Sequence, residues 1–207
     1  MAHWNGNQLC AIDCETTGLD PLYDEILTLA IIPLTSNIEP RKDVMPLHLL
    51  IQPEYPERIK EEAMKVNKID LAEHMSKAFD KETALNLFEE WQKKLGLPYS
   101  KYGKPKKITP LGQNYLGFDK GFIQQWMGLS LYDDYFDYHC VDTMVAANYI
   151  NDRAAFHGEP HVFNKVNLGF LATTLKVPHD RAHDALEDAR VCAAVYREML
   201  KMGPLLL

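Results

Sequence analysis

The chain has 207 residues, of which 46% are hydrophobic and 25% are charged, and this composition predicts one globular domain spanning residues 1–207. The formal net charge of −7 argues against a protein that coats nucleic acid, because extended phosphate contact needs many Lys and Arg side chains. A small site that holds divalent cations is not excluded, since cations bind a phosphodiester with few basic residues.

No apolar run is long enough to span a membrane, and the N-terminus lacks the basic-then-apolar order of a signal peptide. The four cysteines, Cys10, Cys14, Cys140 and Cys192, form no C-x2-C pair, so neither a zinc site nor a disulfide framework is expected. We interpret them as reduced core residues and predict a cytoplasmic protein without membrane contact.

The first half of the chain predicts strands followed by helices. Strands are expected at residues 9–14, 25–34 and 44–52, close enough in sequence for an antiparallel meander. Helical patterns follow at residues 56–66 and 81–95.

The second half alternates the two kinds of element. Short strands are expected at residues 108–111 and 136–140, and helices at 118–127, 142–150, 167–175 and 184–202. Three strands followed by this alternation predict an α/β fold, a mixed sheet with helices packed on it.

The stretch "CAIDCETTGLD", residues 10–20, places Asp13 and Glu15 in an otherwise apolar strand. Because side chains alternate along a strand, the two carboxylates share one face, about 6.8 Å apart along the strand. Like charges this close raise each other's pKa, and a cation between them removes the conflict. Carboxylate oxygens without sulfur ligands favour Mg²⁺ or Mn²⁺.

Two other interpretations of this stretch remain open when it is taken alone. If the strand ends near Asp13, "ETTGLDP" is a polar turn. The order Asp13, Glu15, Thr17 also approaches a phosphatase-like D-x-D-x-T loop, although that loop has Asp where this chain has Glu15.

Further acids follow at two places in the chain. "LGQNYLGFDKGFI" supplies Asp119 after a strand and at a helix start, where it could also serve the helix dipole. "AHDALEDAR" has the D-x-x-E spacing of a capping box at Asp184 and Glu187. Asp184 as the N-cap puts His183 outside the helix, free to reach the site that Asp188 faces from one turn inside.

The segments "DCETTGLD", "NYLGFD" and "HDALED", in this order, resemble the three motifs of the DEDD exonuclease superfamily, histidine subclass. This group includes polymerase proofreading subunits, ribonuclease T and oligoribonuclease. The resemblance covers residues 13–188. It implies a ribonuclease-H-like α/β fold and metal-dependent 3′→5′ release of nucleoside monophosphates from single-stranded or frayed DNA or RNA ends.

The resemblance also implies roles for individual residues. Asp13, Glu15 and Asp188 would hold one divalent cation, and Asp13 and Asp119 a second, each Mg²⁺ or Mn²⁺. His183 would be the general base. An imidazole suits that role near neutral pH, and two cations suit in-line displacement at phosphorus.

Substrate contacts are implied around the same motifs. The backbone near Thr16, together with Leu19, would meet the terminal nucleotide, and Asn114 and Phe118 belong to the second motif. Asp142 in "CVDT" would be a supporting residue. The family often has His where this chain has Gln113, and the spacing to Asp119 is nearer that of oligoribonuclease.

Two other functions compete with this one. A metal-dependent phosphatase would use Asp13 as nucleophile, and it leaves His183 unexplained. A non-catalytic nucleic-acid-binding module would be favoured by loss of one of the five catalytic candidates, but all five are present. The sequence does not decide between DNA and RNA, between proofreading, RNA processing and oligonucleotide recycling, or between oligomeric states.

Several features outside the motifs have open roles. Four lysines in residues 101–107, beside Tyr99 and Tyr102, could hold single-stranded nucleic acid or form a solvated loop. No role is assigned to His179, and the pair His157 and His161 is interpreted as part of a surface loop. The apolar tail, residues 202–207, could pack on the domain or dock a partner. Association with a polymerase or other replication protein would be with another chain.

Overall fold

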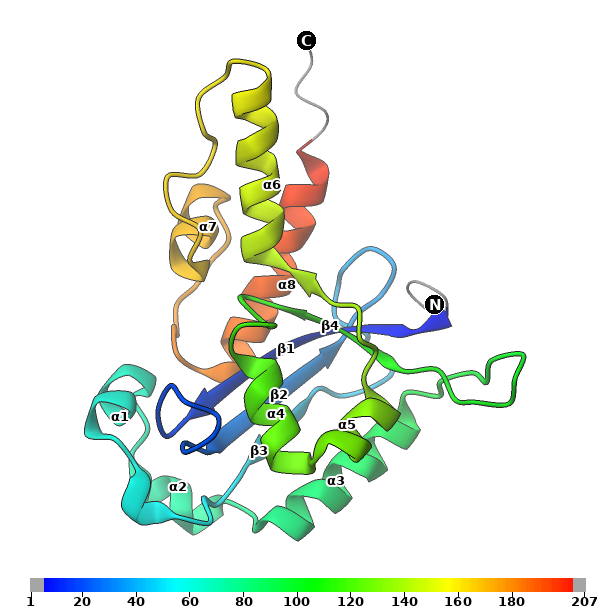
Figure 1. Cartoon of the computed structure of the whole chain (residues 1–207), viewed down its shortest axis with the longest axis vertical. Coiled ribbons are helices and arrows are strands. Elements are labelled where there is room, and N and C mark those ends of the chain that lie inside the picture. The colour runs from blue at the N-terminus through cyan, green and yellow to red at the C-terminus, as the bar shows by residue number, and fades with distance from the viewer. Residues whose placement is uncertain (1–5, 203–207) are drawn as a thin grey trace.

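A five-stranded mixed sheet lies at the centre of the computed structural model, which describes residues 6–202 (Figure 1). Its strand order is β3-β2-β1-β4-β5. The first three strands pair antiparallel, as predicted, whereas β4 and β5 continue the sheet in parallel. The strands are β1 (Gln8–Thr16), β2 (Ile26–Pro33), β3 (Leu47–Leu50), β4 (Ile108–Gly112) and β5 (Val141–Asp142).

Strand β1 is central in the sheet and is buried on both faces because helices pack on each side of it. Its even-numbered residues Cys10, Ile12 and Cys14 join one hydrophobic cluster, while Leu9 and Ala11 join another on the opposite face. This confirms the predicted alternation and places Asp13 and Glu15 on the same face as Ala11.

One face of the sheet is covered by α3 (Lys81–Lys94), α4 (Asp119–Met127) and α5 (Leu129–Tyr135) (Figure 1). An aromatic core fills this interface, in which Phe88 stacks on Phe136 at 5.9 Å between ring centroids. Its other rings are those of Trp91, Phe122, Trp126 and Tyr132.

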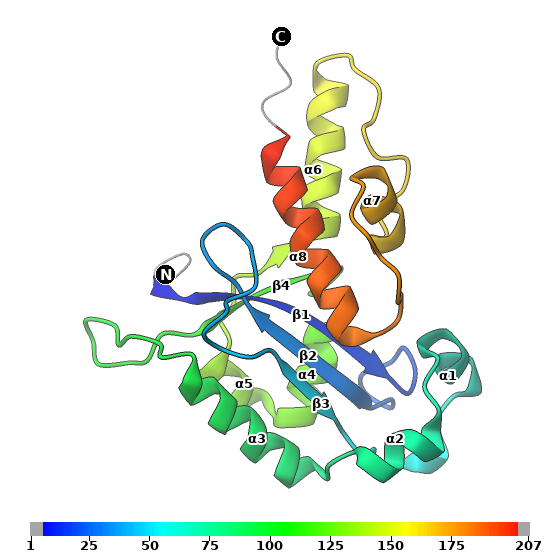
Figure 2. The same ribbon diagram turned by 180° about the vertical axis from the view of Figure 1, so that it is seen from behind.

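The other face is covered by α8 (Ala185–Lys201), which lies in front of the sheet in Figure 2. Small side chains let the helix approach closely, among them Ala185, Ala189 and Ala193. Helices α6 (Thr143–Phe156) and α7 (Leu168–Thr174) pack beside α8 around a third cluster. The helix expected at residues 184–202 therefore packs on the face of the sheet that carries Asp13 and Glu15.

The segment after β3 differs from the expected single helix over residues 56–66. It forms a 3₁₀ turn at Pro56–Arg58 and then α1 (Glu61–Asn67), because Lys60 is extended and donates its backbone N–H to Thr17 O at 3.0 Å. A further helix, α2 (Leu71–Lys77), was not predicted. Asp70 caps it by accepting a hydrogen bond from the Glu73 N–H at 2.9 Å.

The fifth strand also differs from its prediction at residues 136–140. Phe136 makes only an isolated bridge to Ile108, and the paired strand is Val141–Asp142. The residues between them turn where Asp137 accepts a hydrogen bond from the His139 N–H at 2.8 Å. Helix α6 then begins at Thr143 and runs six residues past the expected end, whereas α5 was not predicted.

No helix within residues 6–202 combines the length and the apolar character needed to cross a bilayer. All four cysteines are free, and Cys10, Cys14 and Cys192 are buried as predicted, whereas Cys140 is only partly buried. The tail from residue 203 onward lies outside the described residues.

Candidate active site

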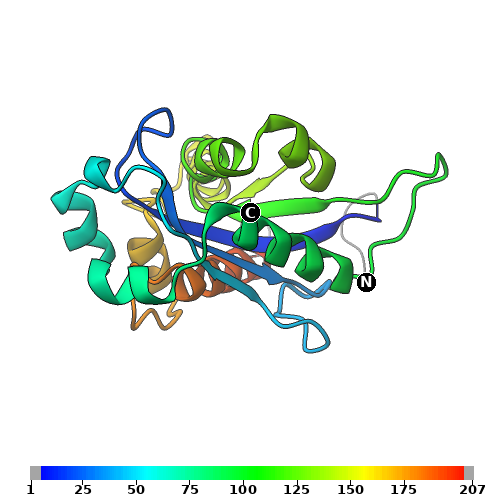
Figure 3. The same cartoon turned by 90° about the horizontal axis from the view of Figure 1, so that it is seen from below.

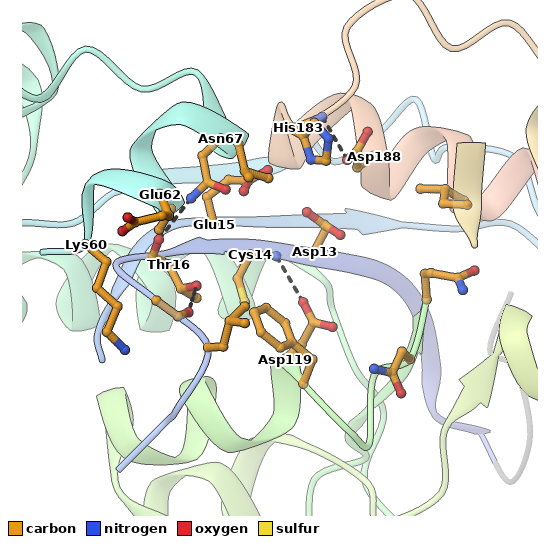
Figure 4. Close-up of a pocket in the computed structure, with 18 residues that line it drawn as sticks. Asp13, Cys14, Glu15, Thr16, Lys60, Glu62, Asn67, Asp119, His183 and Asp188 are labelled. Carbon is orange, nitrogen blue, oxygen red and sulfur yellow. Dashed lines mark hydrogen bonds between the residues drawn. The ribbon is translucent and has the colours of Figure 1, made fainter. Parts of the chain in front are cut away.

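A cavity of about 560 Å³ opens beside the C-terminal end of β1 (Figure 4). Its walls come from β1 and the loop after it, from α1, from the loop between β4 and α4, and from the start of α8. All the residues that the three motifs single out as catalytic or substrate-binding line it: Asp13, Glu15, Thr16, Leu19, Asn114, Phe118, Asp119, His183 and Asp188.

Asp13 and Glu15 project from β1 toward the start of α8 (Figure 4). Burial raises the pKa of Asp13 well above its ordinary value, and the charge of Asp119 adds to this. Burial likewise raises the pKa of Glu15 to about 8, with the charge of Asp188 acting in the same direction. The pair therefore sits in an environment that disfavours negative charge unless a cation is bound.

Asp119 enters the cavity as the first residue of α4. Its Oδ1 accepts a hydrogen bond from the backbone N–H of Cys14 at 3.1 Å, drawn as a dashed line in Figure 4. Its side chain does not cap α4, so the carboxylate faces β1 instead. Burial raises the pKa of Asp119 to about 7, although the hydrogen bonds from Cys14 lower it.

The start of α8 is built as its capping pattern predicts. Asp184 is the N-cap and accepts a hydrogen bond from the Glu187 N–H at 3.1 Å. The Glu187 side chain does not return to the cap, because it pairs with Arg190 at 2.5 Å. Only one half of the expected capping box is therefore present.

His183 lies outside α8 in a left-handed conformation, with φ of +68°. Its backbone N–H donates to Asp188 Oδ2 at 3.1 Å, and its side chain is exposed at the cavity. This is the arrangement expected from the cap at Asp184. A tethered backbone leaves the imidazole free to turn toward a bound substrate.

The donor set fits a hard divalent cation. A carboxylate oxygen of Glu15, a carboxylate oxygen of Asp188 and a ring nitrogen of His183 all lie within 4.8 Å of one another. Asp13 and Asp119 line the same cavity. Carboxylate oxygens are the ligands that Mg²⁺ and Mn²⁺ prefer, and a bound cation would offset the burial and the mutual repulsion that raise the pKa values of Asp13 and Glu15.

His179 belongs to the site, although no role was predicted for it. Its Nε2 lies 2.5 Å from Asp188 Oδ1, and both side chains are only 12% exposed. The contact arises because residues 179–183 fold back along the first turn of α8. No motif marks His179, and its spacing of four before His183 carries no signal in a loop.

Helix α1 supplies a wall that sequence reasoning also missed. Asn67 donates from Nδ2 to Thr16 O at 2.9 Å, and the Lys60 ammonium pairs with buried Asp24 at 2.6 Å. Glu62 and Val66 complete this wall. Contacts between α1 and the loop after β1 thus set the shape of the cavity near Thr16.

The loop that carries Gln113 and Asn114 is held in place by hydrogen bonds to neighbouring segments. Asp142 accepts a hydrogen bond from the Asn114 N–H at 3.1 Å and caps α6, as its expected supporting role requires. Both ends of the Gln113 amide are engaged, by Val166 O at 2.7 Å and the Thr143 hydroxyl at 2.6 Å. Gln113 therefore links this loop to α6 and to the segment before α7.

The lysine-rich segment does not join the cavity. Tyr99 bridges Pro105 to form a hairpin, which projects from the opposite end of the molecule to α1 (Figures 1 and 3). Tyr99 and Tyr102 are both exposed on it. His157 and His161 are exposed in the loop after α6. Neither feature contacts the carboxylates.

Comparison with known proteins finds similarity to exonucleases in sequence and in fold. The family model RNase_T, described as an exonuclease, matches residues 10–101. Oligoribonuclease of Buchnera aphidicola subsp. Acyrthosiphon pisum (strain APS) is 24% identical over 193 residues, covering 90% of this chain and 88% of that protein. A structure of exonuclease I superposes with a TM-score of 0.72 at 18% identity. The chain is thus similar to exonucleases, by sequence over residues 10–101 and by fold over nearly its whole length.

The likeness to solved structures of exonuclease I confirms the predicted ribonuclease-H-like fold. The exonuclease I match covers 96% of this chain but only 42% of that one, so the chain spans about two fifths of exonuclease I. E. coli exonuclease I in complex with a dT13 oligonucleotide has a TM-score of 0.69 at 18% identity, covering 95% of this chain and 41% of that one. Cell-death related nuclease 4 has a TM-score of 0.69 at 17% identity, covering 95% and 64%.

Proposed function

We propose that the chain is a single-domain, metal-dependent 3′→5′ exonuclease that releases nucleoside monophosphates from single-stranded or frayed DNA or RNA ends. The observation that carries this proposal is the convergence, in one cavity, of Asp13, Glu15, Asp119, His183 and Asp188 from three distant segments. The oligonucleotide bound to E. coli exonuclease I supports a single-stranded substrate.

The carboxylates have distinct positions in this proposal. Asp13, Glu15 and Asp188 would hold one Mg²⁺ or Mn²⁺ ion, and Asp13 and Asp119 a second. When bound, such a pair activates water and neutralises charge on the attacking and leaving oxygens of an in-line displacement. The similarity to exonucleases and the acidic cluster support a divalent cation.

His183 is proposed as the general base. It is the histidine that lines the cavity, it is exposed, and only its backbone is tethered to Asp188. Its imidazole would accept the proton of the attacking water and would pass it to solvent after the mononucleotide leaves.

The terminal nucleotide is proposed to lie between the loop after β1 and α1. Leu19 is 81% exposed at the cavity and offers an apolar surface to a base, while the backbone near Thr16 offers polar groups to the sugar. Asn114 and Phe118 also line this cavity. A cavity of about 560 Å³ is in the size range of small-ligand sites, which suits release of one nucleotide at a time.

The phosphatase alternative gains no support from the geometry. It would leave the position of His183, close to Glu15 and Asp188 in the same cavity, unexplained. A non-catalytic module would not need five converging catalytic candidates.

The decisive experiment incubates the protein with matched 5′-labelled single-stranded DNA and RNA oligomers in Mg²⁺, Mn²⁺ or EDTA. We expect a metal-dependent ladder that shortens one nucleotide at a time from the 3′ end and is absent in Asp188→Asn. Asp180→Asn, an exposed acid on the same loop outside the cavity, is the matched control and should cleave normally. No cleavage of either polymer would refute the proposal.

A further inference from the structure

Two histidines lie on the loop before α8, and only one of them lines the cavity. We infer that the other, His179, is a positioning residue that holds the Asp188 carboxylate in its metal-binding orientation. The inference rests on the proposed function, since it concerns the same acidic cluster.

The geometry of Asp188 carries the inference. Its Oδ1 lies 2.5 Å from His179 Nε2, and its Oδ2 accepts the His183 backbone N–H at 3.1 Å. An ionised carboxylate only accepts hydrogen bonds, so Nε2 is the donor. Each oxygen has two lone pairs, so both contacts leave Asp188 able to bind a cation.

His179 is itself held in place by the first two turns of α8. Arg190 donates from Nη2 to Pro178 O at 3.3 Å, next to His179, and it is fixed by its ion pair with Glu187 at 2.5 Å. The imidazole is therefore presented to Asp188 by a braced loop.

Without His179, the side chain of Asp188 would keep only the His183 backbone contact. A side chain with one partner samples other rotamers, and a metal site loses affinity when its ligands are not held in the binding geometry. Partners that hydrogen-bond metal ligands typically change metal affinity or activity by about 10–100-fold when removed.

His179 is not proposed to take part in catalysis directly, because it does not line the cavity. His183 is among the residues that line the cavity, whereas His179 is not. His179 would act on the reaction only through Asp188, so its loss should appear first in metal binding.

The test measures Mn²⁺ binding by electron paramagnetic resonance for the wild type, His179→Ala and His179→Gln. Exposed His161→Ala is the control for loss of an imidazole. We expect His179→Ala to weaken Mn²⁺ binding by about 10–100-fold. Gln restores an N–H donor near the position of Nε2 and should recover most of the affinity. Raised Mn²⁺ should restore the kcat of His179→Ala, with the KM for an oligonucleotide unchanged.

Thermal unfolding in EDTA establishes that each variant is folded before Mn²⁺ binding is compared. If His179→Ala does not fold, His179→Gln is compared instead with His179→Asn, whose amide has a shorter reach. Wild-type Mn²⁺ affinity in His179→Ala, or equal losses in Ala and Gln, would overturn the inference. If the wild type itself bound no Mn²⁺, the proposed metal site would fail and the inference with it. If the wild type binds Mn²⁺ and either overturning result is found, the inference about His179 fails while the proposed metal site stands.

Discussion

Cys14 and Asp119 are 105 residues apart in sequence, yet the backbone N–H of Cys14 donates a 3.1 Å hydrogen bond to Asp119 Oδ1. This bond joins the strand that carries Asp13 and Glu15 to the helix that carries Asp119. Because the donor is a backbone group of the central sheet, the position of the Asp119 carboxylate is determined by the fold of β1.

Asp119→Asn should remove the negative charge of this side chain and keep its hydrogen bond from the Cys14 N–H. The amide Oδ1 still accepts from Cys14, so the fold is kept, but a metal-binding charge is lost. We expect kcat to fall by about 10³-fold, because metal stabilisation of reacting oxygens is worth several kcal/mol. Single-turnover cleavage at saturating Mn²⁺ measures this.

The comparison for Asp119→Asn is Asp142→Asn, which changes a buried carboxylate that caps α6. That variant should lose thermal stability more than Mn²⁺ affinity. If Asp119→Asn lost mainly thermal stability and Asp142→Asn lost mainly Mn²⁺ affinity, the assignment of Asp119 to the metal site would be contradicted.

His183→Ala should remove the general base and preserve the metal cluster. The backbone N–H that holds Asp188 Oδ2 remains in the variant, so Mn²⁺ binding should persist. The rate should fall by about 10²–10⁴-fold, the usual range for a general base. Cleavage measured at several pH values checks this, and an unchanged rate would exclude His183 as the base.

Leu19→Ala should weaken substrate binding with little change in metal binding. The side chain is 81% exposed and lines the cavity, so its apolar surface is available to a base. Loss of about 1 kcal/mol of apolar contact should raise KM about fivefold.

Leu22→Ala is a close control for Leu19→Ala, since Leu22 is equally exposed on the same loop but does not line the cavity. Its KM should match that of the wild type. Equal effects in both variants would argue that the loop as a whole, and not Leu19, meets the substrate.

Without bound metal, the free energy of unfolding should fall as the pH rises toward 8. Glu15 and Asp119 have pKa values of about 8 and about 7 in the folded protein, above their ordinary values. Between about pH 4 and pH 8 the folded state therefore binds more protons than the unfolded chain, and the free energy of unfolding falls as pH rises.

Thermal unfolding in EDTA from pH 5 to pH 8.5 measures this dependence. Asp119→Asn should flatten the fall because one titrating group is removed, and Mg²⁺ should reverse it by binding the deprotonated cluster. Carboxyls with lowered pKa, such as Asp24, act below this window. Stability that rises with pH in EDTA would contradict the shifts.

The sequence predicts most of the sheet and the convergence of the acidic side chains because both leave periodic or local signals. Alternation along β1 places Asp13 and Glu15 on one face, and the cap at Asp184 places His183 outside α8. These features depend on backbone geometry within a few residues, which single-sequence patterns report directly.

Features decided by distant contacts were missed. The break before α1 follows from a hydrogen bond between Lys60 and Thr17, and β5 is shifted because the segment after Phe136 turns around the Asp137 side chain. His179 was missed for the same reason, since its partner Asp188 becomes a neighbour only when the loop folds against α8.

The strand that carries Asp13 and Glu15 and the loop that carries His183 should open on different timescales. Asp13 and Glu15 lie on β1, whose residues pair with β2 through to Thr16 and with β4 at Cys10 and Ala11. Their amide hydrogens should exchange with solvent only when the whole sheet unfolds, whereas the loop bearing exposed Arg181 and His183 can open locally. A mononucleotide could then leave past the loop while the strand that carries two of the ligands stays folded for the next cycle.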